Sequence, residues 1–447
     1  MTYSPITKND VKDMLNAINV NSLDELFNIV PEKFRLDFSK FDIPEALSEQ
    51  EVYLKLSEIG KKNIASKNNT FIGGGVYDHY VPTIVDFLSS RSEFYTAYTP
   101  YQPEVSQGTL QYLYEFQSMI CALSGMDVAN ASLYDGASAV AEACSMAIAY
   151  NRKNKILISS SVNPDYVAVV KSYFSYNNIN IEFSKAEDGV MNPVALSRSI
   201  NDDTSCIVVQ SPNYYGLLED LEGISKLKAT YPDLLVICVS DPVSLSLIKS
   251  PGDCDCDVYV GEGQPLGNYL SFGGPYIGLF AAKEKYIRKM PGRIIGRTVD
   301  VDEKEGFVMT LQTREQHIRR ERATSNICTN QGLVALRCTI YLALLGKEGL
   351  VNIATTCFEN AQYAADMISK LDNFSLQYNN KNFLKEFVVK TKFSVESLIK
   401  DASDNGFNIA SLKNDETDSL FLLAFTEKYS KDKIDSFVDY LSAYKNK

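Results

Sequence analysis

Histidine and long apolar runs are both scarce in this sequence, and each shortage excludes a class of function. Only two of the 447 residues are histidine, His79 and His317, which leaves little material for a metal site built from several histidines. No apolar run approaches the roughly 18 residues of a membrane-spanning helix. The N-terminal segment carries acidic residues and lacks an apolar core of the signal-peptide type, so we expect no secretory leader.

Basic residues are outnumbered by acidic ones. Lysine and arginine total 44 against 56 aspartates and glutamates, which gives a formal net charge of -12. Broad binding to nucleic acid or to an anionic membrane needs a basic face, so this balance argues against both. A chain of 447 residues can bury a large core and divide into two or three domains.

The nine cysteines show no pairing pattern. An odd number spread through a long chain predicts reduced thiols in a cytoplasmic protein rather than a disulfide framework. Cys254 and Cys256 lie close together, but no second cysteine pair or nearby histidine completes four ligands at zinc spacings. We therefore expect loop thiols here and no metal site.

We expect three parts along the chain. Residues 1–69 predict a helical arm, of a kind that packs on a neighbouring domain or subunit. Residues 70–330 alternate apolar strand candidates with helices, which predicts an α/β domain with a mostly parallel sheet covered on both faces. Residues 331–447 begin with an apolar helix and predict a smaller C-terminal α+β domain.

Two local expectations follow from the same pattern. Leu23, Leu26, Phe27 and Val30 recur at helical spacing and predict one apolar helix face that ends at Pro31. Residues 290–330 are polar, basic and irregular in their pattern, so we expect no regular element there.

The loop at residues 257–278, DVYVGEGQPLGNYLSFGGPYIG, lacks a lysine. Upstream of it, LLVICVSDP predicts a buried strand that ends in an acid, Asp241. Many pyridoxal-phosphate (PLP) enzymes use such an aspartate to pair with the pyridinium nitrogen, and a lysine after the next strand to form the Schiff base. Here Gln264 stands where that lysine is expected, and a primary amide cannot form the imine. The pattern predicts a PLP site without its covalent anchor.

A turn at Gly136 resembles the phosphate cradle of such a site. The segment SLYDGASAVAEA, residues 132–143, predicts a strand-like entry followed by a helix N-terminus, where free amides and the helix dipole favour an anion. Asp135 at its mouth would repel a phosphate and is itself a good N-cap. We expect a degenerate cradle. A second glycine-rich segment, residues 71–82, lacks the spacing of a P-loop or a dinucleotide site and favours a tight turn at a domain edge.

Two further segments have the residue types of contact surfaces. Residues 94–117 place Tyr98 and Tyr101 in a proline-stiffened loop, which suits the wall of a pocket, a partner surface or an ordinary buried loop. Residues 313–331 gather His317, Arg319 and Arg320 in an acidic chain, which suits a carboxylate, a phosphate or the acidic surface of a partner. A solvated helix face with glutamate counter-charges is the structural alternative for the basic cluster.

Taken together, these segments resemble the glycine dehydrogenase (decarboxylating) P-protein family of the glycine cleavage system. More narrowly, they resemble subunit 1, the alpha chain of its split form. Five motifs carry the resemblance in order along residues 71–331: FIGGGVYDHYVP, TAYTPYQPEVSQGTLQYLYEFQ, SLYDGASAVAEA, GEGQPLGNYLSFGGPYIG and HIRRERATSNICTNQ.

The resemblance implies an aspartate-aminotransferase-like fold, PLP fold type I, in which only the partner, subunit 2, keeps the PLP lysine. It implies that Gln264 occupies the place of that lysine and that Asp241 is a relic of the pyridine-nitrogen partner. With subunit 2, such a chain decarboxylates glycine and passes the aminomethyl group to the lipoyl arm of lipoylated H-protein. No cofactor is then bound covalently by this chain.

The resemblance also suggests where the chain meets its partners. Tyr98, Tyr101 and Gln102 would reach toward the active site of subunit 2. His317, Arg319 and Arg320 would brace the interface or meet acidic H-protein. Two alternatives stay open: a self-sufficient PLP decarboxylase or lyase that uses Lys249 or Lys283, neither expected at a strand end in the required loop, and a scaffold that only stabilises or regulates a PLP enzyme.

Overall fold

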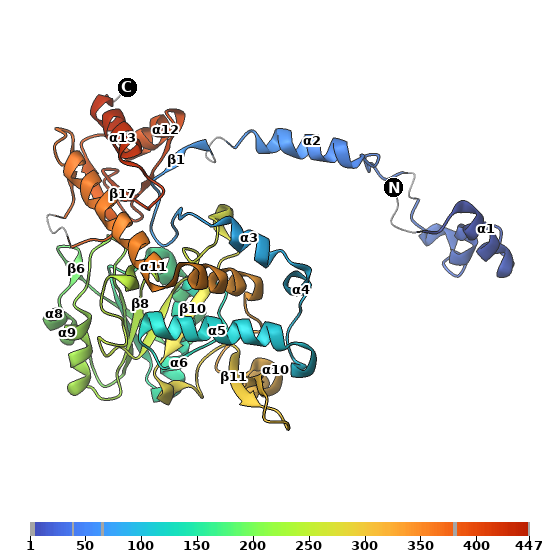
Figure 1. The fold of residues 1–447 in the computed structure, drawn as a ribbon, viewed down its shortest axis with the longest axis horizontal. Coiled ribbons are helices and arrows are strands. Elements are labelled where there is room, and N and C mark those ends of the chain that lie inside the picture. Colours follow the sequence, from blue (N-terminus) through green and yellow to red (C-terminus); the bar gives the residue numbers. More distant parts are fainter. Residues whose placement is uncertain (1–4, 38–39, 64–66, 379–381, 446–447) are drawn as a thin grey trace. The chain divides into compact units, whose positions relative to one another are not determined.

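A computed structural model describes residues 5–37, 40–63, 67–378 and 382–445, and it divides the chain into the units Met1–Ile64 and Ala65–Lys447 (Figure 1). In the part of the chain that is described, no helix combines the length and the apolar character needed to cross a membrane.

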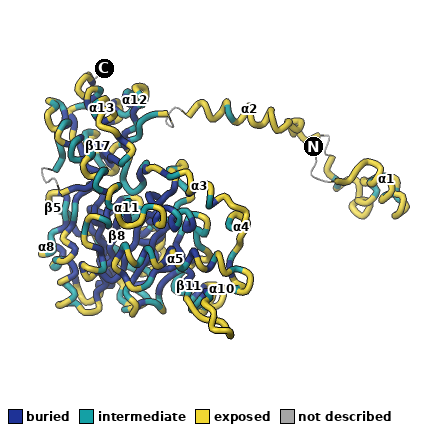
Figure 2. The backbone as a smooth tube through the Cα atoms, in the orientation of Figure 1, coloured by how far each residue is buried: buried dark blue, intermediate teal, exposed yellow. Residues whose placement is uncertain are grey.

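The first unit consists of short helices and 3-10 turns. It contains α1 (Lys8–Ala17), α2 (Glu49–Gly60) and two 3-10 turns, Leu23–Phe27 and Glu32–Phe34. Ser48 accepts the N–H of Glu51 and the Glu51 carboxylate accepts the N–H of Ser48, the capping box that the spacing indicates. None of its described residues is buried (Figure 2).

The helix predicted from Leu23, Leu26, Phe27 and Val30 is wrong in type. Ser22 does cap the segment by accepting the N–H of Glu25, but Leu23–Phe27 forms a 3-10 turn with exposed leucine and phenylalanine side chains. A short helix needs an apolar surface to pack on, because its own propensity does not stabilise it. The described residues of this unit supply no such surface.

The second unit is built on a seven-stranded sheet with the order β2-β10-β9-β8-β7-β3-β4. Its strands are β2 (Val128–Ala129), β3 (Lys155–Ser159), β4 (Asn180–Ser184), β7 (Thr204–Gln210), β8 (Leu235–Val239), β9 (Val258–Glu262) and β10 (Gly278–Ala282). The strands from β4 to β9 pair in parallel, and β10 runs antiparallel to both of its neighbours. The predicted mostly parallel sheet is therefore confirmed.

Helices cover both faces of this sheet. On one face α6 (Gly136–Asn151) and α7 (Pro164–Phe174) pack against each other and share a core with Ile156 and Ile158. On the other, α5 (Gln107–Ser124) and the first part of α11 (Gly332–Ile368) belong to the same core as Leu157. Alternate residues of β3 thus point to opposite cores, as a doubly covered strand requires.

Shorter elements join these layers. They are α3 (Thr83–Ser89), α4 (Ser92–Tyr95), β5 (Ala186–Glu187), β6 (Val190–Met191), α8 (Pro193–Ser197), α9 (Leu221–Ser225) and α10 (Gln316–Arg319). The segment expected to be irregular contains an antiparallel hairpin, β11 (Ile294–Val299) with β12 (Glu305–Thr310), so that expectation is wrong there. Ile294 and Ile295 are buried and anchor the strand, whose last three residues, Arg297 to Val299, are exposed.

A second sheet, with the order β13-β14-β17-β16, forms the C-terminal part. Its elements are β13 (Phe374–Leu376), β14 (Glu386–Thr391), β16 (Ala410–Ser411), β17 (Leu420–Ala424), α12 (Val395–Asp404) and α13 (Lys431–Ala443). The second part of α11 begins at a bend at Gly346, whose φ is 58°, and shares the core of this sheet. The predicted α+β character of this region is confirmed.

Phe71 fixes the start of the first glycine-rich segment to this C-terminal part. Its ring stacks on Phe437 and Tyr429, with centroids 4.3 and 4.7 Å apart. The preceding strand β1 (Asn69–Thr70) pairs in parallel with β15 (Phe407–Asn408). Residues that follow Phe71 are thereby led from the small sheet toward the edge of the large one.

Glu142 on α6 generates a pH-dependence prediction. Its side chain is buried, and its Oε2 finds no hydrogen-bond partner among the described residues. Burial raises the pKa of Glu142 to about 7. The folded state therefore holds a proton that the unfolded state releases near its ordinary pKa, so this residue lowers stability as pH rises from about 4.5 to about 7.

Glu142→Gln carries no charge at any pH and should remove that loss. We expect the variant to match the wild type at pH 5 and to exceed it by about 2–3 kcal/mol at pH 8 in urea unfolding. An equal stability difference at both pH values would contradict the assignment.

Candidate functional site

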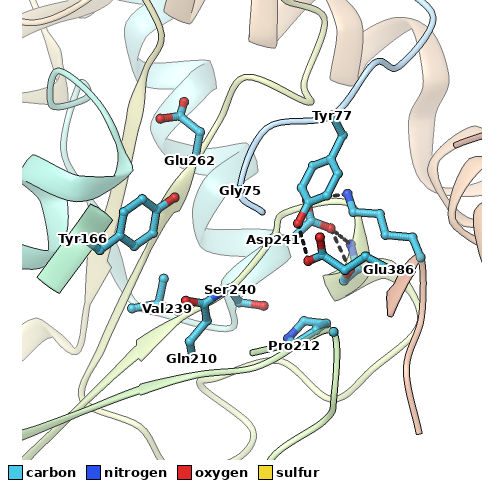
Figure 3. Close-up of a pocket in the computed structure, with 13 residues that line it drawn as sticks. Gly75, Tyr77, Tyr166, Gln210, Pro212, Val239, Ser240, Asp241, Glu262 and Glu386 are labelled. Carbon is cyan, nitrogen blue, oxygen red and sulfur yellow. Dashed lines mark hydrogen bonds and ion pairs between the residues drawn. The ribbon is translucent and has the colours of Figure 1, made fainter. Parts of the chain in front are cut away.

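The carboxyl ends of β7, β8 and β9 meet the start of β14 at a small enclosed cavity (Figure 3). Its volume is about 20 Å³, enough for one or two water molecules. The lining residues are Gly75, Tyr77, Tyr166, Gln210, Pro212, Gly216, Val239, Ser240, Asp241, Ser244, Glu262, Lys385 and Glu386. Six of these carry an ionisable group or a phenolic hydroxyl: Tyr77, Tyr166, Asp241, Glu262, Lys385 and Glu386.

Asp241, which follows β8, is neutralised by the protein itself. Lys385 Nζ lies 2.8 Å from its Oδ1, and Ser244 donates to its Oδ2 from both the hydroxyl and the backbone N–H. Burial opposes the charged carboxylate, but Lys385 and Ser244 outweigh it and lower the pKa of Asp241. The carboxylate is thus ionised and fully paired without a ligand.

Lys385 is held in place by an aromatic ring and an imidazole. Its Nζ lies 3.5 Å from the centroid of the Tyr77 ring and 3.4 Å from His79 Nε2. A buried ammonium against a ring face gains a cation–π attraction. The Tyr77 hydroxyl in turn donates to Glu386 Oε1 at 2.6 Å, while Glu386 Oε2 accepts the N–H of Gly74. Burial raises the pKa of Glu386 to about 7.

His79 links this cluster to the loop after β17. Its Nδ1 lies 2.7 Å from Glu427 Oε2, and Glu427 Oε1 accepts the N–H of Tyr80. Burial opposes the charge on Glu427, but the bond from His79 outweighs it and lowers the pKa to about 2. Cys357 Sγ donates to Glu427 Oε2 at 3.6 Å. His79, Cys357 and Glu427 are residue types that can bind a metal, but their proximity is explained by these hydrogen bonds.

Gln264 makes three hydrogen bonds to backbone groups. Its Oε1 accepts the N–H of Tyr77 at 2.8 Å, and its Nε2 donates to the carbonyls of Tyr77 at 3.0 Å and Asn268 at 2.7 Å. The side-chain amide of Gln264 therefore bonds both the N–H and the carbonyl of Tyr77, the two groups that a neighbouring β-strand would otherwise bond. A lysine has no acceptor and could not make the first of these bonds.

Glu262 and Gly136 meet at the N-terminus of α6. Asp135 caps this helix by accepting the N–H of Ser138 at 2.7 Å, as its position in the sequence indicates. The next free amide, that of Gly136, donates to Glu262 Oε2 at 3.0 Å. The predicted cradle is therefore closed by a carboxylate from within the chain.

These residues do not fit a PLP. The cavity has no room for a pyridine ring, Glu262 stands at the helix end where a phosphate would bind, and Gln264 cannot form an imine. Lys385 does not replace the missing lysine. It pairs with Asp241, the residue expected beside the ring nitrogen of a bound PLP, whereas a Schiff-base lysine would be needed on the opposite side of that ring.

The two lysines considered as alternatives lie elsewhere. Lys249 is exposed and pairs with Glu222. Lys283 does follow a strand directly, contrary to expectation, but β10 runs antiparallel to β9 and ends at the opposite edge of the sheet. Its ammonium pairs there with Asp255.

Three of the remaining predicted site residues, Tyr101, His317 and Arg320, lie together at a second surface. The Tyr101 ring packs edge-on against His317, with centroids 6.0 Å apart, and the guanidinium of Arg293 lies 5.5 Å from its centroid. A cavity of about 430 Å³ is lined by Tyr101, Glu315, Gln316, His317, Arg320, Glu321, Ile327 and Cys328. Tyr98, Gln102 and Arg319 are exposed and do not line it, and Tyr98 is 89 % exposed.

Sequence reasoning missed Glu262, Lys385 and Glu386, all of which line the first cavity. Glu262 had a signal, because it is an acid at the very end of an apolar strand run. Lys385 and Glu386 precede another apolar run, but nothing local brings them to Asp241, which lies 144 positions earlier in the chain. Arg293, which lies against the Tyr101 ring, was missed for the same reason, whereas Glu315 was expected only as a counter-charge of the basic cluster and does pair with His317.

Comparisons with known proteins agree with one another. A family model described as "Glycine cleavage system P-protein" matches residues 1–441. The chain is 46 % identical to "Probable glycine dehydrogenase (decarboxylating) subunit 1" of Prosthecochloris aestuarii, over 99 % of this chain and 100 % of that protein. It is 45 % identical to the protein of the same description from Chloroherpeton thalassium, over 99 % of each.

Solved structures give the same picture of the fold. A crystal structure of "glycine decarboxylase (P-protein) of the glycine cleavage system, in inhibitor-bound form" matches with a TM-score of 0.91 and 36 % identity, over 99 % of both chains. Lactobacillus brevis glutamate decarboxylase matches with a TM-score of 0.69 at 14 % identity, over 92 % of this chain and 95 % of that one, which shows the fold alone.

Removing only one member of the buried Asp241–Lys385 pair should destabilise the protein strongly, whereas removing both charges should not. Lys385→Met leaves the Asp241 carboxylate buried without its cation, which should lower the free energy of unfolding by about 3–5 kcal/mol. The double variant Asp241→Asn with Lys385→Met should recover most of that loss, because neither group is then charged. Urea unfolding at pH 7 measures all three proteins.

Lys413→Met provides the matched control. Lys413 also pairs with an aspartate, Asp165, but both side chains are more than half exposed, so the change should cost less than about 1 kcal/mol. A Lys385→Met variant as stable as this control would show that the buried pair contributes nothing.

Proposed function

Because the chain belongs to the glycine cleavage system P-protein family, we propose that it is the subunit of a two-subunit glycine decarboxylase that anchors no PLP. Its partner is subunit 2, which carries the cofactor. The assembled enzyme releases the glycine carboxylate as carbon dioxide and passes the remaining aminomethyl group to the lipoyl arm of H-protein. The observation that supports PLP binding by subunit 2 rather than by this chain is the pocket around Asp241, Glu262 and Gln264, which is already filled by side chains.

A partner subunit is supported by unsatisfied groups at the second surface. Glu315 Oε1 and Arg293 Nε are buried and have no hydrogen-bond partner among the described residues. Arg293 Nε lies 4.0 Å from Glu315 Oε2, so the two groups form an ion pair that leaves hydrogen-bonding capacity unused, which favours a surface completed by another molecule. Tyr101 and His317 stand directly beside them, and we propose that this surface faces the active site of subunit 2.

The helical arm supports the same proposal independently. Ile29, Phe34 and Leu36 are exposed, and Ile29 is 90 % exposed. So much apolar surface on one short segment is typical of an interface. We propose that the partner subunit covers it.

The basic residues of α10 and the turn after it are proposed to meet H-protein. His317, Arg319 and Arg320 are exposed on a segment whose only acidic neighbours are Glu315 and Glu321 among residues 313–323. Cations gathered on an acidic chain suit an acidic partner, because they raise the rate of encounter and fix its orientation.

Reductive trapping tests the assignment of the cofactor. The purified chain is mixed with PLP and reduced with borohydride, alone and with subunit 2, and each chain is weighed by intact-mass spectrometry. We expect the PLP adduct on subunit 2 only, and glycine decarboxylation only in the mixture. A stoichiometric adduct on one lysine of this chain, with activity in the absence of subunit 2, would make it a complete enzyme instead.

Charge removal tests the H-protein surface. Arg319→Ala should raise the KM for H-protein several-fold, with a difference that shrinks as salt is added, since an exposed charge acts mainly at long range. Arg198→Ala removes another exposed arginine, which follows α8, and should leave that KM unchanged.

Two tyrosine variants separate an active subunit from a scaffold. If Tyr98 and Tyr101 reach the site on subunit 2, Tyr98→Phe and Tyr101→Phe should lower turnover in a complex that still assembles. Normal turnover and normal H-protein affinity in both tyrosine variants and in Arg319→Ala would discard these roles and favour a purely structural subunit.

A further inference from the structure

Glu315 has one carboxylate oxygen that no group of the described chain bonds. The side chain is 7 % exposed, and its Oε2 faces two basic groups, His317 Nδ1 at 3.5 Å and Arg293 Nε at 4.0 Å. Its Oε1 is buried and has no hydrogen-bond partner among the described residues. A buried carboxylate oxygen without a donor is unfavourable, so an N–H group of another molecule would be stabilised at this atom.

Arg293, on the other side of this ion pair, is fixed by its own hydrogen bonds. Its two terminal nitrogens donate to the Tyr101 hydroxyl and to three oxygen atoms of residues 328–330. Its Nε is buried without a hydrogen bond and is the nitrogen that lies 4.0 Å from Glu315 Oε2. The guanidinium therefore cannot turn toward Glu315 Oε1 without breaking these bonds, and the oxygen stays available.

Glu315 lines the cavity of about 430 Å³ together with Tyr101, His317 and Arg320. This volume lies within the range of about 300–1,000 Å³ that is typical of small-molecule pockets. Arg320 is exposed, and among the described residues no ion pair holds its guanidinium. Its backbone has a φ of 54° and a ψ of -128°, a strained conformation for a residue with a Cβ. The cavity thus combines a free carboxylate oxygen with a free guanidinium.

We propose that this cavity binds the zwitterion of a small α-amino acid, glycine, whose ammonium donates to Glu315 Oε1 and whose carboxylate accepts from Arg320. A ligand with a positive charge alone would meet the guanidinium groups of Arg293 and Arg320, and a ligand with a negative charge alone would meet Glu315. A ligand that carries both charges close together satisfies both. The choice of glycine rests on the proposed function, because glycine is the substrate of the assembled enzyme. The site then holds glycine at the surface proposed to face subunit 2.

Ligand-observed NMR on the full chain, without subunit 2 and without PLP, tests the proposal directly, since no cofactor is then present to react with glycine. Glycine should bind with a Kd in the millimolar range. Methylammonium and acetate each carry one of the two charges and should bind at least about tenfold more weakly. Glycine betaine keeps both charges but has no N–H to donate to Glu315 Oε1, so it should not displace glycine.

Four single variants locate the binding. Glu315→Gln and Arg320→Gln should each raise the Kd for glycine at least about tenfold. Glu321→Gln and Arg322→Gln are the matched controls, because these two side chains are 79 % and 83 % exposed and pair with each other. Both controls should bind glycine as the wild type does, although Glu321 also lines the cavity.

Arg320 is exposed, so Arg320→Gln decides the question if Glu315→Gln does not fold. Three results would overturn the proposal: no glycine binding by the wild-type chain, unchanged affinity in Arg320→Gln, or binding of acetate, methylammonium or glycine betaine as tight as that of glycine. Arg319 does not line the cavity, so the test of the H-protein surface is separate. A failure here also leaves the reductive trapping result, and with it the proposed function, unaffected.

Discussion

The structure depends on one constraint: carboxylates at the buried edge of the large sheet must be neutralised or hydrogen-bonded by the chain itself. Asp241 and Glu262 come from the ends of neighbouring parallel strands, and Glu386 comes from the start of β14. An unpaired charge in such a place costs several kcal/mol. Each group is stabilised differently. Asp241 forms an ion pair with Lys385, and Glu262 accepts hydrogen bonds from backbone amides. Glu386 accepts hydrogen bonds from the Tyr77 hydroxyl and the Gly74 amide.

These answers tie together parts of the chain that are distant in sequence. Lys385 and Glu386 arrive from the small sheet, while Tyr77 belongs to the glycine-rich segment that Phe71 anchors in the C-terminal core. Gln264 then clamps the backbone of Tyr77 to the large sheet. The side chains that fill this pocket therefore connect the large sheet to the small one.

Much of this arrangement could be predicted from the sequence, and the rest could not. The parallel sheet and α6 follow from local patterns, since apolar runs and a capped, alanine-rich segment carry their own signals. Gln264 was informative because the loop around it lacks a lysine. Lys385 and Arg293 carry no local signal, because their roles depend on contacts made only in the folded chain. The helix predicted from Leu23, Leu26, Phe27 and Val30 did not form, because a local helical pattern also needs a surface against which its apolar face can pack.

The path of the chain from Asn69 to Tyr80 has a thermodynamic consequence. It is fixed at Phe71 inside an aromatic core and at Tyr77 by both ends of a buried amide. Neither sheet can come apart without exposing a ring or breaking a buried bond that also belongs to the other. Within the unit Ala65–Lys447 we therefore expect the unfolding of one sheet to destabilise the other.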